Sequence, residues 1–163
     1  MRNRMFLAGS LAVLGLFAGA CQLDVERNTD GSLQIEAVIT EADIANEIAR
    51  GMQAEESGVT VDLRNGYALI EAVGPTADNP LTESFSFRME LFVVDGHLGA
   101  EVSDARWNDI EIPQAMVEVW NEELAEELEA GAKEDPDSTL VAVQIKNKEL
   151  RFEFRHETEQ SQG

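Results

Sequence analysis

Apolar and polar residues alternate along most of the chain, which is the pattern of strands that bury one face. The segment 33–39 shows it clearly, with Gln34 and Glu36 between apolar neighbours. Short runs of Asn, Asp and Gly separate such segments, and these residues suit the tight turns of hairpins. The pattern predicts four hairpins, which pair 23–27 with 33–39, 59–63 with 67–73, 85–93 with 98–102, and 140–145 with 150–154.

Two segments replace this alternation with apolar residues at helical spacing. In the first, Thr40 stands three residues before Asp43, the arrangement of a capping box. The apolar stripe that follows is Ile44, Ile48 and Met52. The second begins near Pro113, a residue favoured in the first turn of a helix, and we expect it to end at Gly131. Its stripe is Met116, Trp120, Leu124 and Leu128.

The order of these elements predicts an α+β domain, in which a curved antiparallel sheet of about eight strands packs on two amphipathic helices. Strand, helix, acidic loop and hairpin follow one another twice, over 33–73 and over 107–154. Asn65 and Asn147 stand at matching turns of the two segments. We therefore also expect an internal strand-helix-hairpin repeat.

The amino end has the pattern of an export signal. Arg2 and Arg4 precede an apolar or small run, 5–17, that contains no charged residue. This run is shorter than the roughly 20 apolar residues of a membrane-spanning helix. A positive segment followed by a short apolar one is typical of a secretory signal peptide.

Cys21, the only cysteine, directly follows the small residues Ala18, Gly19 and Ala20. This stretch resembles the lipobox of bacterial lipoproteins, which implies that Cys21 is acylated and that the chain is cut just before it. The alternative is an ordinary secretory cleavage after Ala20 that leaves a free thiol. We predict a signal peptide over 1–20, a single domain with lipidated Cys21 over 21–155, and a disordered tail over 156–163.

Composition limits the partners of such a domain. Residues 1–20 hold two of the 12 basic residues and none of the 32 acidic ones, so the mature chain is more acidic than the net charge of −20 of the full chain. This charge repels nucleic acid and anionic headgroups, so we expect no nucleic-acid partner. With one cysteine there is no internal disulfide, and apolar burial has to stabilise the fold.

The anchored cysteine, the order of elements and the stretches ITEADIANEI and VVDGHL resemble the LmeA-type and other small lipid-binding envelope lipoproteins. These are distantly tied to the tubular lipid-binding superfamily. The resemblance covers roughly residues 33 to 155. It implies a curled antiparallel sheet that wraps a helix and encloses an apolar groove. It carries no ligand residue over to this chain.

Residue patterns of catalysis are weak. His97 follows a turn glycine and His156 lies in the polar tail, so both are expected to be solvated. An acylated Cys21 is no nucleophile, and neither a nucleophile elbow nor a glycine-rich phosphate loop is present. We expect no enzyme activity, no catalytic residue and no cofactor.

One short row suggests metal but is better explained by a turn. Glu26, Asn28, Asp30 and Gly31 copy the first half of a calcium loop. The closing position of such a loop is Ala37 in this chain, which offers no carboxylate. We therefore interpret the row as a hairpin turn and expect no metal site.

Apolar side chains are the remaining candidate for a binding site. Aromatic and methionine side chains supply area and adapt in shape, which suits a lipid tail. Ordinary core packing uses the same residue types, and the sequence leaves both interpretations open. The candidate ligand residues are Phe85, Phe87, Met89 and Leu91 on one strand face and Met116, Trp120 and Leu124 on the second helix.

We therefore expect a non-catalytic bacterial lipoprotein, exported and anchored through Cys21 to the outer face of the cytoplasmic membrane or to the outer membrane. It would bind a lipid or another apolar envelope molecule in a groove between sheet and helices. The alternative is a structural or interaction lipoprotein of the cell envelope with a filled core, no ligand and a protein partner.

Overall fold

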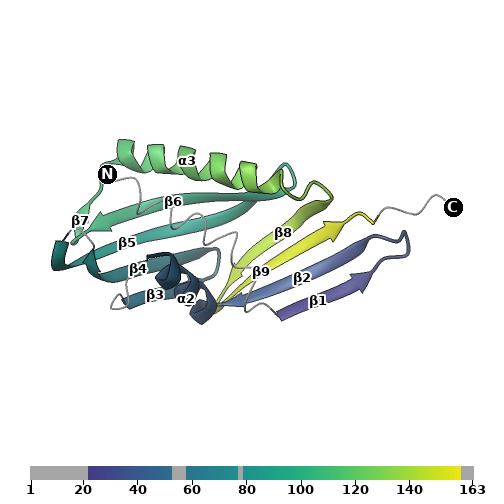
Figure 1. The fold of residues 1–163 in the computed structure, drawn as a ribbon, viewed down its shortest axis with the longest axis horizontal. Coiled ribbons are helices and arrows are strands. Elements are labelled where there is room, and N and C mark those ends of the chain that lie inside the picture. The colour runs from purple at the N-terminus through teal and green to yellow at the C-terminus, as the bar shows by residue number, and fades with distance from the viewer. Residues whose placement is uncertain (1–21, 53–57, 77–78, 159–163) are drawn as a thin grey trace.

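The computed structural model describes residues 22–52, 58–76 and 79–158, which contain nine strands and two helices (Figure 1). The strands form two antiparallel sheets: sheet A in the order β1-β2-β9-β8, and sheet B in the order β3-β4-β5-β6-β7. The α+β class is as predicted, whereas the single sheet of about eight strands is wrong. The predicted signal peptide, 1–20, and Cys21 lie outside the described residues.

Sheet A contains β1 (Gln22–Arg27), β2 (Leu33–Thr40), β8 (Ser138–Lys146) and β9 (Glu149–His156). The turn after β1 closes where the Asn28 amide donates to the Ser32 carbonyl at 2.9 Å. β2 pairs with β9 along its whole length, and Leu33 lies opposite His156. His156 therefore belongs to the sheet and not to the tail that the sequence predicted from 156 onward.

Sheet B contains β3 (Gly58–Arg64), β4 (Tyr67–Thr76), β5 (Asn79–Val94), β6 (His97–Trp107) and β7 (Ile110–Glu111). All four predicted hairpins are present in the two sheets. The short strand β7 was not predicted. The turn before it consists of Asn108 and Asp109, both with positive φ (48° and 63°), so two non-glycine residues form a tight turn here.

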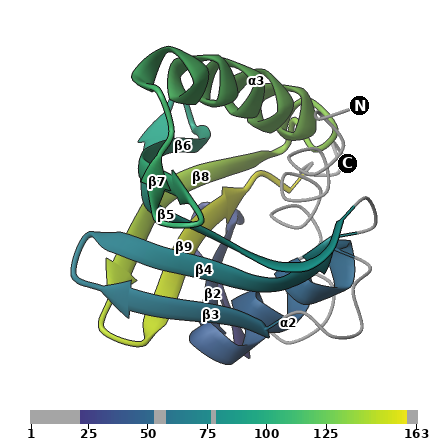
Figure 2. The same ribbon diagram turned by 90° about the vertical axis from the view of Figure 1, so that its left-hand side faces the viewer.

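The first helix, α2 (Glu41–Met52), begins with the predicted capping box. The Thr40 amide donates to Asp43 Oδ2 at 3.0 Å, and the Asp43 amide donates to Thr40 Oγ1 at 3.3 Å. Ile44 is buried and Ile48 partly buried against the core, as the apolar stripe predicts. Figure 2 shows α2 beside β3, at the opposite end of sheet B from the second helix.

The second helix, α3 (Gln114–Ala132), lies along β6 with Val117 and Leu128 buried. Gly131 is still helical, so the predicted end falls short. Met116 is 46% exposed, although it opened the predicted stripe. Each step of four residues advances about 40° beyond a full turn. Three such steps separate Met116 from Leu128, so the two residues lie roughly 120° apart around the helix axis. The packed stripe therefore starts from Val117.

The interior consists of two separate buried clusters. The first core lies between sheet A, α2 and strands β3 and β4. The second core is smaller and joins β6 to α3 through Val102, Ala105 and Val117. Phe87 on β5 is only partly buried and packs against both cores. β5 is therefore the strand along which the two cores meet.

Candidate apolar binding site

The middle strand of sheet B places the predicted ligand residues on one face. In the register with β4, Phe87 lies opposite Ile70 and Met89 opposite Ala68. In the register with β6, Met89 lies opposite Val102 and Leu91 opposite Ala100. Side chains alternate along a strand, so the four predicted residues of β5 share the inner face of the sheet. We call them the β5 strip: Phe85, Phe87, Met89 and Leu91.

Burial across this face is the reverse of the usual order. In a five-stranded sheet the middle strand is normally covered best, yet every residue of the β5 strip is only partly buried. Their neighbours on the flanking strands are fully buried, with Ala68 at 2%, Ile70 at 4% and Val102 at 5% exposure. An alanine lies opposite three of the four strip residues, so these larger side chains of β5 extend further from the sheet than the alanines beside them.

An aromatic group gathers at the Phe85 end of the strip. The Phe85 ring centroid lies 5.4 Å from that of Phe87, 5.9 Å from Trp107 and 6.1 Å from Trp120. These spacings are in the range of favourable aromatic pairs. Trp120 comes from α3, so the helix meets the strip at this end. Leu124, one turn further along, is partly buried against the second core.

Two corrections follow for the predicted site residues. Met116 is exposed, because it lies about 120° around the helix axis from the buried Leu128 and so falls outside the packed stripe. Trp107 belongs to the aromatic group but was not predicted. It ends β6, outside the predicted strand 98–102, and its place opposite Phe85 depends on a register shift in the pairing of β5 with β6.

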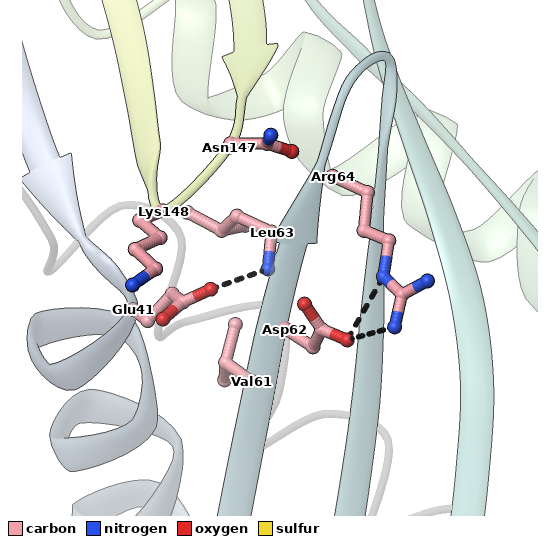
Figure 3. A pocket seen from close by; sticks show the side chains of 7 residues that line it. All are labelled: Glu41, Val61, Asp62, Leu63, Arg64, Asn147 and Lys148. Atoms are coloured by element: carbon pink, nitrogen blue, oxygen red, sulfur yellow. Dashed lines mark hydrogen bonds and ion pairs between the residues drawn. The ribbon is translucent and has the colours of Figure 1, made fainter.

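A second feature is a polar cavity of about 260 Å³ where β3, α2 and the β8–β9 turn meet (Figure 3). Its lining residues are Glu41, Val61, Asp62, Leu63, Arg64, Asn147 and Lys148. Glu41 Oε1 accepts a hydrogen bond from the Leu63 amide at 2.8 Å. Arg64 donates to Asp62 Oδ2 at 2.6 Å, and this hydrogen bond lowers the pKa of Asp62. Asp62 and Arg64 form an ion pair, Glu41 is held by a backbone amide, and none of the predicted ligand residues lines this cavity.

The turn that resembled half a calcium loop is occupied by internal hydrogen bonds. Asp30 Oδ1 accepts from the Ser32 amide at 3.0 Å and from the Ser32 hydroxyl at 2.6 Å. Asp30 Oδ2 accepts from Arg155 at 2.6 Å. These contacts are those of a hairpin turn, as predicted. Across residues 22–52, 58–76 and 79–158, no three His, Cys, Asp or Glu side chains are grouped as metal ligands.

Comparison with known proteins found no relative. No family model matches the chain, and no similar curated protein or solved structure was found. In the part of the chain that the structure describes, neither helix is long and apolar enough to cross a membrane.

Proposed function

We propose that this protein is a non-catalytic, lipid-anchored envelope protein that binds an apolar ligand, such as a lipid acyl chain, along the β5 strip. One observation carries the proposal: the strip is only partly buried although it lies on the middle strand of sheet B. A ligand chain lying on these four side chains would complete the burial that the flanking strands already have.

The chemistry of the strip suits such a ligand. Phe85, Phe87 and Trp120 supply large apolar surfaces, and Met89 supplies a flexible one. Fully burying a side chain of this size contributes roughly 1.5–3 kcal/mol, and the strip residues, already partly buried, would gain only a fraction of that. Most of the affinity would therefore come from the ligand's own apolar surface, at about 0.8 kcal/mol per buried methylene. The strip lies where the two cores meet: Phe87, Met89 and Leu91 pack against the first core from below, and their partly exposed surfaces are what a ligand would cover.

The anchor is proposed from the sequence. The basic start, the short apolar run and the small residues before Cys21 support export and acylation of that cysteine. Two or more acyl chains are needed for stable membrane attachment, because one chain alone binds reversibly. The proposed location is therefore the outer face of the cytoplasmic membrane or the outer membrane.

We also propose that the chain contains an internal repeat. The first unit runs β2-α2-β3-β4 and the second runs β6-α3-β8-β9, with β7 inserted before α3. The strand of the first unit lies in sheet A and its hairpin in sheet B, whereas the second unit has the reverse arrangement. The exchange supports two related units that share their sheets.

Native mass spectrometry of the protein released gently from its own host tests ligand binding. We expect a bound apolar molecule, and we expect Phe85→Ser to weaken binding of a fluorescent long-chain fatty acid about tenfold, equivalent to roughly 1.4 kcal/mol. Leu69→Ser is the matched control, because Leu69 is 38% exposed on the outer face of the neighbouring strand. Far-UV circular dichroism verifies that both variants fold.

No co-purifying molecule and no fatty-acid binding by the parent protein would contradict the proposal. Equal loss in Phe85→Ser and Leu69→Ser would also contradict it, because the effect would then not belong to the strip. Recovery of one dominant protein after crosslinking in intact cells would instead favour the structural or interaction lipoprotein.

A further inference from the structure

β1 carries two apolar side chains that the described structure leaves more than half exposed. Leu23 is 59% exposed and Val25 is 54% exposed. In the register with β2, Leu23 lies opposite Ala37 and Val25 opposite Ile35. Ala37 is fully buried in the first core, so Leu23 and Val25 stand on the core-facing side of sheet A and not on its outer side. We call these two side chains the β1 face.

Burial on this side of sheet A decreases towards β1. Ile39 and Phe152 are at most 2% exposed, and Ile35 and Phe154 are partly buried. Leu23 and Val25 then lie more than half exposed on the outermost strand (Figure 1). The apolar side of the sheet therefore continues out of the core and ends uncovered at its edge.

The position of this edge in the chain indicates what covers it. Leu23 is the second residue after Cys21, and two extended residues span about 7 Å. If Cys21 holds acyl chains in a bilayer, β1 begins at the lipid interface with no linker between them. We propose that the β1 face docks on the membrane interface, with Leu23 and Val25 inserted among the lipids; this inference rests on the lipid anchor proposed above.

Charge defines the kind of membrane surface. The other side of β1 presents Gln22, Asp24 and Glu26, and the side of Leu23 and Val25 also carries Arg27 at the end of the strand away from Cys21; all are exposed. The whole chain has a net charge of −20, which opposes contact with anionic headgroups. Docking is therefore apolar, onto neutral or zwitterionic lipid, with Asp24 and Glu26 directed to water. Insertion of a few apolar side chains reaches the boundary of headgroups and acyl chains, about 5–10 Å deep.

Single-site labelling of the lipidated full chain tests this docking. In the lipidated protein the Cys21 sulfur is a thioether, so Val25→Cys introduces the only reactive thiol. An environment-sensitive fluorophore at position 25 is compared with one introduced by Glu26→Cys, which lies next to it on the opposite side of β1. Both proteins are reconstituted in phosphatidylcholine vesicles, and each label is quenched by brominated lipid.

We expect the label at 25 to be quenched roughly threefold or more above the label at 26, because only the former reaches the acyl boundary. Adding phosphatidylglycerol should reduce this difference, through repulsion of the acidic chain. Equal, water-like signals from both labels on a protein that floats with the vesicles would overturn the docking alone. A label at position 25 that reports an apolar environment but is not quenched by brominated lipid, together with crosslinks between copies, would also overturn membrane docking. The β1 face would then be covered by a second copy of the chain.

The anchor itself is tested in the same preparation. A parent chain that does not float with the vesicles, or whose Cys21 reacts with the label, would disprove acylation and remove the basis of the docking. Such a result would leave fatty-acid binding on the β5 strip to be decided by its own experiment, so the two proposals fail separately.

Discussion

Gly66 and Ile145 are joined backbone to backbone, since the Gly66 amide donates to the Ile145 carbonyl at 2.9 Å. The Lys148 amide returns a hydrogen bond to the Leu63 carbonyl at 3.2 Å. When Asn65 is aligned with Asn147, Leu63 falls on Ile145 and Gly66 on Lys148. Each turn thus donates one backbone hydrogen bond to the other turn and accepts one at the equivalent position. Two equivalent contacts of this kind are what a two-fold axis produces. The proposed repeat predicts this reciprocity.

The two turns differ at one matching position, which gives the first prediction. Gly66 has φ +93° and Lys148 has φ +71°. A left-handed conformation costs an L-residue about 1–2 kcal/mol, and glycine loses about 0.5–1 kcal/mol more backbone entropy on folding. We expect Lys148→Gly to raise the free energy of unfolding by about 0.5–1 kcal/mol, and Gly66→Ala to lower it by a similar amount. Urea denaturation measures both.

Gly66→Ala is informative because a Cβ at this position meets no atom within 4 Å. Its effect is therefore one of backbone conformation and not of crowding. A Lys148→Gly variant no more stable than the parent would show that the turn carries no such strain.

The Asn121 side chain joins α3 to β6 through hydrogen bonds. Replacing it gives the second prediction. Asn121 Oδ1 accepts from the Val102 amide at 2.7 Å, and Asn121 Nδ2 donates to the Val102 carbonyl at 2.9 Å. Since β7 pairs only with residues 106 and 107 of β6, the side chain replaces a missing neighbouring strand. Buried groups left without partners cost about 1–3 kcal/mol. We expect Asn121→Ala to destabilise the protein by about 2–3 kcal/mol in urea denaturation.

The control for this prediction is Asn46→Ala, a change of the same residue type at an exposed position of α2. It should alter the free energy of unfolding by less than about 0.5 kcal/mol. Equal effects of the two substitutions would mean that the contact with Val102 contributes nothing beyond helix propensity.

Local chemistry made the hairpins predictable, while long-range pairing made the sheets unpredictable. Asp95 and Gly96 favour a tight turn on their own, and the strands beside them pair as expected. Asn108 and Asp109 form a similar turn without glycine, and so gave no strong signal. The pairing of β2 with β9 joins residues more than a hundred positions apart, and alternation within each strand cannot specify that choice.

The same distinction applies to the candidate site. Alternation assigns Phe85, Phe87 and Met89 to one face, but exposure depends on what the other elements cover. Trp107 joined the aromatic group through a register shift that no local pattern indicates. Asn121 is a polar residue within the apolar stripe of α3. It hydrogen-bonds to a stretch of β6 that has no neighbouring strand on that side, and only the tertiary structure shows this.

Phe92 and Gly99 form a cross-strand pair that gives the third prediction. A Cβ added to Gly99 would clash with the Phe92 ring, so the ring rests directly on the glycine. Phe92 is 44% exposed and is able to swing outward, which limits the damage of the added methyl group. We expect Gly99→Ala and Phe92→Ala each to destabilise the protein by roughly 1 kcal/mol. Their combination should cost about 0.5–1 kcal/mol less than the sum.

A double-mutant cycle in urea provides this coupling. Strict additivity of the two changes would contradict the contact. The pair Leu69→Ala and Gly99→Ala serves as the control, because Leu69 lies on β4 and pairs with Arg88 rather than with Gly99.

Asp30 gives the fourth prediction, a dependence of stability on pH. Hydrogen bonds from Ser32, and to a lesser degree the charge of Arg155, lower the pKa of Asp30 below its usual value of 3.8. A carboxyl whose pKa is lower in the folded state stabilises that state above the unfolded pKa, and the contribution is lost as the pH falls through the folded value. Asp30→Asn should therefore reduce stability at neutral pH, and parent and variant should converge as the pH falls through the lowered folded-state pKa of Asp30.

The order of causes makes this prediction sharper. Because the Ser32 hydroxyl is the largest cause of the shift, Ser32→Ala should bring the pKa of Asp30 closer to its usual value than Arg155→Gln does. Nuclear magnetic resonance titration of the Asp30 carboxyl measures this pKa directly, and urea midpoints across the acid range measure its effect on stability. A larger change in Arg155→Gln would show that charge attraction, and not the hydroxyl hydrogen bond, dominates at this turn.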